Sequence, residues 1–259
     1  MTLCIVWNYA GDIHFASDSR GTVSGNAIDA VIKVLRIPYR ISGAAYPGQP
    51  PPVLAEGEIG MAAAGATLVA MMTKEALVEL VRNMQGVQGH NTFGMDEIAS
   101  FLFQGFKEIC GRFHVMGAAG DTSVIIAGHC AATRKLRSFK MEHVWSLQQQ
   151  FCTEVLSNGG DVEYLGNGIS IATGHIHGRP LTQRVVLAAI QAVIDDPSVP
   201  GVGGNVQYGS FSGSNFVVSG VAVMTQGEVH YWRGPLDLNG AAFNQAGSLL
   251  PSFPYLDLI

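Results

Sequence analysis

The chain has 259 residues, enough for one domain with a substantial core. Hydrophobic residues make up 47% of it and charged residues only 14%, and the mean hydropathy is +0.24, so we expect part of its surface to be buried against sister subunits. The net charge is −5 and the 15 Lys and Arg residues are scattered, which excludes a basic stripe for nucleic acid.

The first elements predicted along the chain are strands. Residues 2–8 and 12–18 are short apolar segments on either side of a Gly-containing turn, which is typical of a β-hairpin. Residues 31–37 predict a third strand after a polar loop. Residues 42–57 predict an irregular insertion, because its prolines do not fit a helix or an inner strand.

Two helices follow in the middle of the chain. A short apolar strand at 59–63 leads into a helix predicted at 67–84, and a second helix is predicted at 95–113, since apolar residues recur in both at helical spacing. Residues 121–128 then predict a strand with a hairpin partner at 136–141.

The last third of the chain mixes one helix with strands. Residues 143–157 fit a strand pair and a short amphipathic helix equally well. A strand is predicted at 169–173 and a helix at 180–194, which begins with Pro180 in its first turn. After a loop at 195–204, residues 216–232 predict a closing hairpin.

This order of elements predicts the α+β class and, more closely, a four-layer α-β-β-α sandwich of two antiparallel sheets. We expect one domain over residues 1–234. Residues 235–259 are expected to be a C-terminal tail that packs on the domain or on a neighbouring subunit.

Thr2 is the candidate nucleophile because it follows Met1 and opens the first apolar run. A threonine hydroxyl is hardly ionised at neutral pH and needs a base beside it. If Met1 is removed, the free α-amine of Thr2, with a reference pKa near ~8, is that base; if Met1 is retained, the amine is lost. Lys33 lies on an apolar segment, where an unpaired cation is costly, so a carboxylate partner is expected.

These residues carry a resemblance to a known family. Thr2 opens the first strand, Asp18-Ser-Arg-Gly-Thr22 follows sixteen residues later, and Lys33 lies within Ile-Lys-Val-Leu-Arg-Ile. A turn of small residues, Met61-Ala-Ala-Ala-Gly-Ala66, opens the first long helix. The set resembles proteasome β-subunits and their bacterial relatives, the HslV peptidase and the Anbu-type homologues, which are N-terminal-nucleophile hydrolases.

The resemblance implies catalytic roles for Thr2, Asp18, Lys33 and Thr173, and a supporting role for Arg20. It makes Thr2 the nucleophile, with Lys33 favouring its deprotonation and Asp18 holding Lys33 charged and oriented. Arg20 is expected to brace this charge cluster.

Further roles follow for substrate contacts and proton transfer. Backbone groups of Thr22 are expected to pair with an extended peptide, and a backbone N–H near Ala64 or Gly65 to form the oxyanion hole. Thr173, in Ile171-Ala-Thr-Gly174, stands where the family has Gly-Ser-Gly on a strand-turn-helix. The family also has an Asp and a Ser after its last helix, which this chain offers only as unassigned candidates: Asp195, Asp196, Ser198, Ser210, Ser212 and Ser214.

The expected function is therefore a threonine-type peptidase, self-compartmentalised as a homo-oligomeric ring. No metal or organic cofactor is required, and His175 and His177 alone are weak evidence for a metal site. Peptides are the expected substrates, an ATP-dependent unfoldase is an open question, and small residues at 62–66 suggest apolar side chains before the cleaved bond. Two alternatives remain: an inactive structural ring and a small-molecule amidase.

The compartment is expected to be the cytoplasm. The N-terminus lacks the basic start of a signal peptide, and no apolar run reaches the roughly 18 residues of a membrane span. The four cysteines are far apart in the sequence and are expected to be buried reduced thiols.

Overall fold

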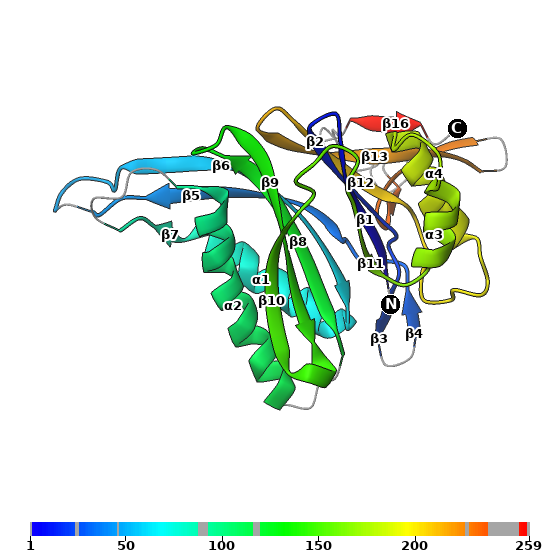
Figure 1. Ribbon diagram of the computed structural model, residues 1–259, viewed down its shortest axis with the longest axis horizontal. Helices are drawn as coiled ribbons and strands as arrows, with labels where there is room; N and C mark the ends of the chain where they lie inside the picture. The colour runs from blue at the N-terminus through cyan, green and yellow to red at the C-terminus, as the bar shows by residue number, and fades with distance from the viewer. Residues whose placement is uncertain are drawn as a thin grey trace, which may run out of the picture.

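The computed structural model shows an α+β fold built mostly of sheet (Figure 1). It describes residues 2–23, 26–45, 47–87, 93–115, 120–225, 228–237 and 254–257. Met1, on which the proposed processing acts, and most of the tail from 238 lie outside the described residues. Within the described ranges, no helix has the length and apolar character needed to cross a bilayer.

The first sheet has eight strands, in the order β11-β1-β2-β12-β13-β14-β15, with β16 paired to β13. Its pairs are antiparallel except β13 with β16, which is parallel. The strands are β1 (Leu3–Tyr9), β2 (Asp12–Ser17), β11 (Val162–Gly166), β12 (Gln207–Ser212), β13 (Asn215–Thr225), β14 (Glu228–Arg233), β15 (Leu236–Asp237) and β16 (Tyr255–Asp257).

The second sheet has six strands, in the order β10-β9-β8-β6-β5-β7, and a separate small hairpin joins β3 to β4. Here only the short pairing of β5 with β7 is parallel. The strands of the hairpin are β3 (Gly21–Val23) and β4 (Asn26–Ile28). Those of the six-stranded sheet are β5 (Val34–Ser42), β6 (Val53–Gly65), β7 (Met84–Gln85), β8 (Thr122–Cys130), β9 (Lys135–Val144) and β10 (Gln149–Val155).

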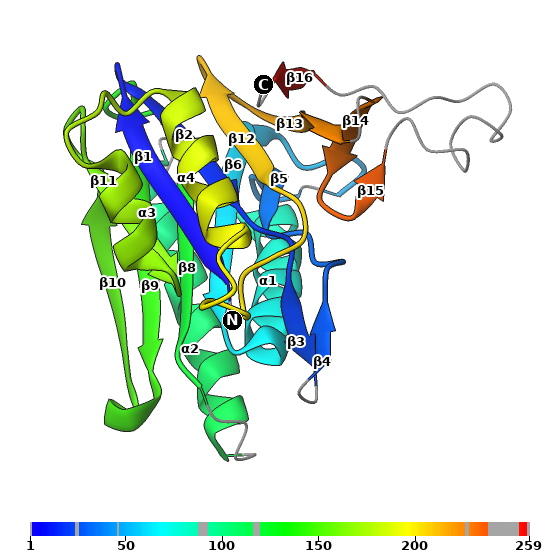
Figure 2. The ribbon, with the colours of Figure 1, turned by 90° about the vertical axis from the view of Figure 1, so that its right-hand side faces the viewer.

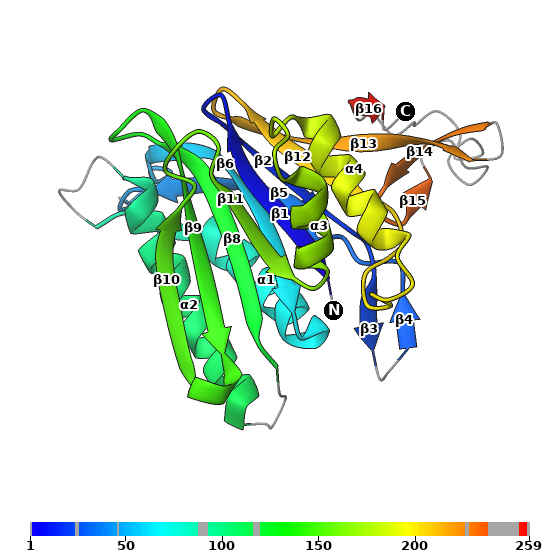
Figure 3. The same cartoon turned by 45° about the vertical axis from the view of Figure 1, so that its right-hand side comes forward.

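The helices pack in two pairs on different sheets (Figure 3). One buried cluster joins the pair α1 and α2 to the six-stranded sheet, and another joins α3 and α4 to the eight-stranded sheet. A third cluster, which includes Phe15, Ile125 and Phe216, lies between the two sheets. The helices are α1 (Thr67–Arg82), α2 (Met95–Val115), α3 (Ile169–Ile176) and α4 (Gln183–Ile194), with a short 3-10 turn at Trp145–Leu147.

Most predicted elements are confirmed, and the differences have local causes. The strand predicted at 31–37 begins only at Val34, since the N–H of Lys33 donates to the side chain of Gln207 and pairing with β6 starts at Val34. The irregular insertion predicted at 42–57 is too long, since β6 begins at Val53, directly after the last proline. The undecided stretch 143–157 is mainly strand β10, paired with β9.

The strand predicted at 169–173 is wrong, because this segment is helix α3. Its two isoleucines suggested a strand, but its buried residues are Ala172 and Ile176, which are four apart and lie on one face of a helix. The strand of this region is β11, which the sequence did not indicate. Gly168 separates the two with a φ of +76°, a conformation that glycine adopts readily.

Candidate active site

The end of β1 carries Thr2, which is 5% exposed and fixed through its peptide bond to Leu3. The N–H of Leu3 donates to Asp18 Oδ1 at 3.0 Å, and the carbonyl of Thr2 accepts from the N–H of Asn167 at 2.7 Å. Both polar groups of this peptide are therefore satisfied, which fixes the backbone of Thr2. Figure 2 shows this end of the chain close to the start of α1 and the β3–β4 hairpin.

Asp18 and Lys33 form a buried ion pair directly beside that peptide. Lys33 Nζ lies 2.6 Å from Asp18 Oδ1, and the two side chains are 4% and 0% exposed. Lys33 Nζ also donates to the carbonyl of Arg20 at 2.6 Å. Because Lys33 and the N–H of Leu3 donate to the same oxygen, the ammonium group lies next to the backbone of Thr2.

The carboxylate of Asp18 is satisfied on both oxygens. Oδ2 accepts the backbone N–H groups of Arg20 at 3.1 Å and Gly203 at 3.0 Å. Three backbone donors and one ammonium thus converge on a fully buried side chain. The side chain of Asp18 is therefore held in place through both of its oxygens.

Gln207 holds the segment that carries Lys33, and the sequence analysis missed it. Its Oε1 accepts the N–H of Lys33 at 3.0 Å, and its Nε2 donates to the carbonyls of Asp18 at 3.0 Å and Val31 at 2.8 Å. Gln207 is fully buried at the start of β12. Burial lowers the pKa of Arg233 to about 10. Its guanidinium donates to the carbonyl of Val34, next to Lys33.

Arg20 braces the opposite side of the cluster. Its guanidinium binds both carboxylate oxygens of Asp29, at 2.6 and 2.8 Å, and donates to the carbonyl of Pro200 at 3.2 Å. The hydrogen bond from Arg20 lowers the pKa of Asp29, which is 44% exposed. Arg20 therefore ties the loop after α4 to the Asp18 turn.

The C-terminal end of β6 lies beside Thr2, and there one edge of the strand has no partner strand among the described residues. Pairing with β5 stops at Ala62 and Val34, while β6 continues beside β8 to Gly65. The N–H of Ala66 donates to Asp121 in the β8 direction, and alternate residues of an antiparallel strand point to opposite sides. The N–H of Gly65 is therefore directed away from β8, to the side of Thr2, whereas that of Ala64 faces β8.

Two hollows meet at Thr2, and they share Ala64, Gly65 and Thr67 as lining residues. The smaller, a narrow pocket of about 30 Å³, lies between β6, Lys33 and α1. The larger is a cleft of about 550 Å³, whose lining includes Asp121, Glu142 and Tyr164. Gly65 has a φ of +125°, and a Cβ there would collide with the carbonyl of Asp121, so only glycine fits this junction.

Thr22 lies in the wall of the larger cleft, on β3. Its N–H donates to the hydroxyl of Thr67 at 3.2 Å. An extended peptide that paired with this N–H would have to displace that hydroxyl first. The structure thus brings Thr22, Ala64 and Gly65 to the same place as Thr2.

Thr173 is not part of this constellation. It is an exposed residue within α3, and neither hollow beside Thr2 includes it in its lining. The turn between a strand and a helix is instead Gly166-Asn-Gly168, between β11 and α3, and Asn167 binds Thr2 there. Thr173 lies away from Thr2 because the strand before this turn is β11, about seven residues earlier than predicted.

The acidic and hydroxyl candidates after α4 also stay apart from Thr2 in the described residues. Asp195 accepts a hydrogen bond from Gln191, and Asp196 accepts the backbone N–H of Ser198. Ser198 lines a separate hollow with Gly166 and Asn167. None of the six candidates lines either hollow at Thr2.

Cys4 is the nearest thiol along the chain, and it is poorly suited to act as a nucleophile. Burial raises its pKa to about 12, although the charge of Lys33 and the hydrogen bond with Ser17 act in the opposite direction. Only the thiolate is strongly nucleophilic. The side chain is also fully buried.

The arrangement as a whole can support acyl transfer. It combines a hydroxyl, a cation fixed by a buried carboxylate, and a directed backbone N–H at one point. These are the parts that nucleophilic catalysis requires around a developing oxyanion.

Comparison with solved structures places the fold in a known class. The chain is similar to an Anbu (Gly-1) mutant from Hyphomicrobium sp. strain MC1, with a TM-score of 0.59 at 11% identity over 94% of this chain and 91% of that one. It is similar to Anbu, described as an ancestral beta-subunit, from Yersinia bercovieri, with a TM-score of 0.59 at 15% identity over 84% and 87% of the two chains.

A third similar structure is the helical assembly of the Anbu complex from Pseudomonas aeruginosa, with a TM-score of 0.58 at 15% identity over 94% and 90% of the two chains. No family model and no curated protein matches the sequence. The chain therefore has a proteasome-related fold, and the particular fold it shares is that of Anbu proteins.

Proposed function

We propose that this protein is a cytoplasmic N-terminal threonine amide hydrolase that cleaves peptides once Met1 has been removed. In this proposal its two sheets and two pairs of helices form the four-layer α-β-β-α sandwich of such hydrolases. Copies of the chain assemble into a ring, and the helical assembly of the similar Anbu complex supports self-association of this fold. The observation that carries the proposal is that Lys33 Nζ and the N–H of Leu3 share Asp18 Oδ1 beside Thr2.

The reaction begins with attack of Thr2 Oγ on the carbonyl carbon of the substrate amide. The α-amine of Thr2 takes the hydroxyl proton, and the Lys33 cation stabilises the developing alkoxide. The N–H of Gly65 donates to the tetrahedral oxyanion. When the C–N bond breaks, the amine proton passes to the leaving nitrogen, and an ester on Thr2 remains.

Hydrolysis of the ester completes the cycle. Water enters the position of the departed amine and gives its proton to the α-amine, which returns it to Thr2 Oγ as the ester breaks. Asp18 keeps Lys33 charged and in place throughout, and Arg20 holds the loop that supplies the Gly203 donor. No step requires a metal ion or an organic cofactor.

Two measurements test this proposal. Intact-mass spectrometry is expected to show the loss of one methionine from the purified protein. A peptide epoxyketone is expected to label Thr2, with the adduct located by peptide mapping. Thr2→Ala should keep the mass loss and the assembly but abolish labelling and peptide hydrolysis, whereas hydrolysis at the wild-type rate in this variant would rule out the mechanism.

The catalytically inactive ring is the second candidate, and one observation favours it. None of the Asp and Ser candidates after α4 reaches the hollows at Thr2, so this half of a proton relay has no counterpart among the described residues. Retention of Met1 together with an intact assembly would support this candidate. A small-molecule amidase would instead be labelled at Thr2 but would not cleave peptides.

A further inference from the structure

The smaller pocket beside Thr2 has a distinct chemical character. Apart from Thr2, Lys33 and Thr67, its lining consists of small or apolar residues and one further lysine, Lys74. The described residues that line it include no carboxylate. It is much the smaller of the two hollows that meet at Thr2, about 30 Å³ against about 550 Å³ for the larger cleft.

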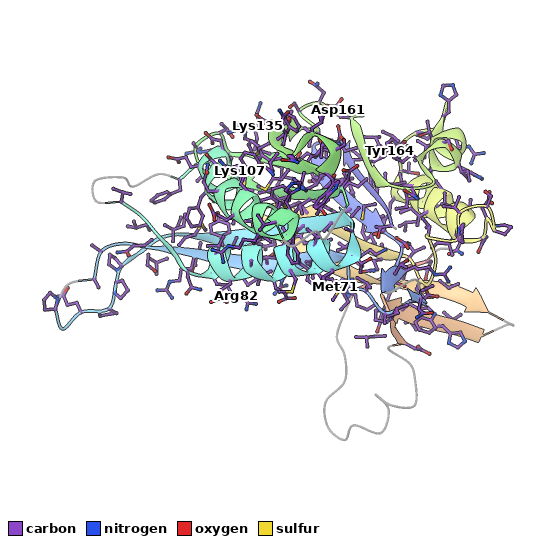
Figure 4. All side chains as sticks on the ribbon, turned by 90° about the horizontal axis from the view of Figure 1, so that it is seen from below. Met71, Arg82, Lys107, Lys135, Asp161 and Tyr164 are labelled. Carbon is purple, nitrogen blue, oxygen red and sulfur yellow. The ribbon has the colours of Figure 1, made fainter. Side chains whose placement is uncertain are left out.

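Lys74 belongs to the face of α1 that forms the pocket wall. Ala70 and Met71 follow Thr67 by three and four residues, and Lys74 follows them by four and three, so all four share one side of the helix. Side chains of a helix lean toward its N-terminus, and that end of α1 is the turn after Gly65. Lys74 therefore belongs to the same pocket wall as Met71, which Figure 4 labels.

The positive charge of Lys74 is poorly compensated. Its side chain is 17% exposed, and its ion pair with Glu75 spans 3.4 Å to a carboxylate that is 69% exposed. Adjacent residues of a helix do not face each other, and such surface pairs contribute little. Lys33, the other cation in the lining, is already engaged by Asp18 and by the carbonyl of Arg20.

The helix itself adds to this positive character. The first turn of α1 contains no acidic residue, and no side chain caps its N-terminus at Ala66. The N-terminal end of a helix carries a partial positive charge. The start of α1 and Lys74 thus both add positive character to the lining of this pocket.

We propose that this pocket binds the acidic side chain of a glutamate or aspartate that precedes the cleaved bond, with Lys74 as its charge partner. The inference rests on the proposed function, because it takes Thr2 as the point of cleavage. It also departs from the expectation of an apolar side chain, which considered only the small residues at 62–66. Lys74 is a specificity-determining residue here and takes no part in bond breaking.

A panel of fluorogenic peptides that differ only in the residue before the cleaved bond tests the proposal. The panel contains Glu, Asp, Gln, Leu and Lys at that position, on the full chain with Met1 removed. We expect kcat/KM for Glu to exceed the values for Gln and Leu by about 10- to 100-fold, the range expected for a hydrogen-bonded charge. The Gln peptide is the matched control for size without charge.

Three variants separate the role of Lys74 from general effects. Lys74→Met keeps much of the side-chain volume and is expected to lower the Glu-to-Leu ratio of kcat/KM by about 10- to 100-fold. Lys74→Glu is expected to move the preference to the Lys peptide. Lys135→Met removes an exposed lysine of β9 that Figure 4 shows well apart from Met71, and it should leave the ratio unchanged.

The outcomes distinguish this inference from the proposed function. If the epoxyketone labels Thr2 and the wild type cleaves Leu and Glu peptides equally well, the specificity inference is overturned and the function stands. An unchanged ratio in Lys74→Met has the same meaning. If no peptide is cleaved and Thr2 is not labelled, the proposed function fails and this inference fails with it.

Discussion

Replacement of Asp18 by asparagine removes one negative charge from a point where four N–H donors converge. Each carboxylate oxygen of Asp18 accepts two of these donors, and asparagine keeps only one oxygen. Whichever way the amide is turned, its N–H₂ group therefore faces two N–H donors, which lose their acceptor. Each unsatisfied buried group costs about 1–3 kcal/mol, and an unpaired buried charge costs about 3–5 kcal/mol. We expect Asp18→Asn to lower the free energy of unfolding by about 3–5 kcal/mol, a large share of the ~5–15 kcal/mol that domains possess.

Removal of the cation is expected to cost less. In Lys33→Met the carboxylate of Asp18 keeps three backbone donors, from Leu3, Arg20 and Gly203, so its charge remains compensated. We expect a loss of about 1–3 kcal/mol. The double variant buries no charge from this pair, and it should be more stable than Asp18→Asn alone.

Urea unfolding followed by circular dichroism measures these differences. All four proteins are compared at one concentration, because association shifts the apparent stability. A double-mutant cycle then isolates the coupling between Asp18 and Lys33. The reasoning is refuted if Asp18→Asn unfolds within 1 kcal/mol of the wild type, or if Lys33→Met is the less stable of the two single variants.

Three further changes test the surroundings of the pair. Gln207→Leu leaves several buried backbone groups without partners and should lower the free energy of unfolding by about 2–4 kcal/mol in urea; a loss below 1 kcal/mol would contradict its role. Asp29→Asn should cost less than ~1 kcal/mol at pH 7, because the pair with Arg20 is partly exposed. The hydrogen bond from Arg20 lowers the pKa of Asp29, so the stabilisation by this pair is present above pH 3.8 and is lost as the pH falls through the lowered pKa of the folded state. The unfolding curves of Asp29→Asn and the wild type should therefore converge at that low pH. A constant difference in stability would contradict this prediction. Gly166→Ala places a Cβ against the carbonyl of Thr2 and should slow epoxyketone labelling, which is followed by mass spectrometry.

Gly160→Ala is the matched control for Gly166→Ala. Both glycines have a positive φ, +95° and +90°, so alanine is strained at either position. A Cβ at Gly160 meets nothing within 4 Å, whereas one at Gly166 meets Thr2. Slower labelling only in the Gly166 variant assigns the effect to Thr2; equal slowing in both would assign it to backbone strain.

Part of this site was accessible from sequence because its signals are local. A lysine within an apolar segment implies a buried partner, and Asp18 is the carboxylate that the structure places 2.6 Å from it. The helices α1 and α2 have a helical repeat of apolar residues long enough to exclude a strand. Gly65 could be singled out because a run of small residues marks a close approach.

Other parts depend on contacts between distant segments, and no local pattern shows them. Gln207 is a single polar residue at the start of a strand, and its role follows only from the position of β12 beside β2. Asn167 acts through its backbone N–H, which every non-proline residue possesses. The segment 169–176 has β-branched residues typical of a strand. It forms a helix because only a helix packs both Ala172 and Ile176 against the eight-stranded sheet.

The buried pair of Asp18 and Lys33 is itself an argument about function. Well-packed apolar residues often replace such a pair without loss of stability, so stability alone does not explain why it is present. A fold that needed only structure at the end of β1 could use an apolar contact there. The pair instead places a charged ammonium group beside Thr2, with its carboxylate partner held by backbone groups from three segments of the chain. If the double variant Asp18→Asn with Lys33→Met folds and assembles like the wild type but is not labelled at Thr2, the charges serve the chemistry of Thr2 and not the architecture around it.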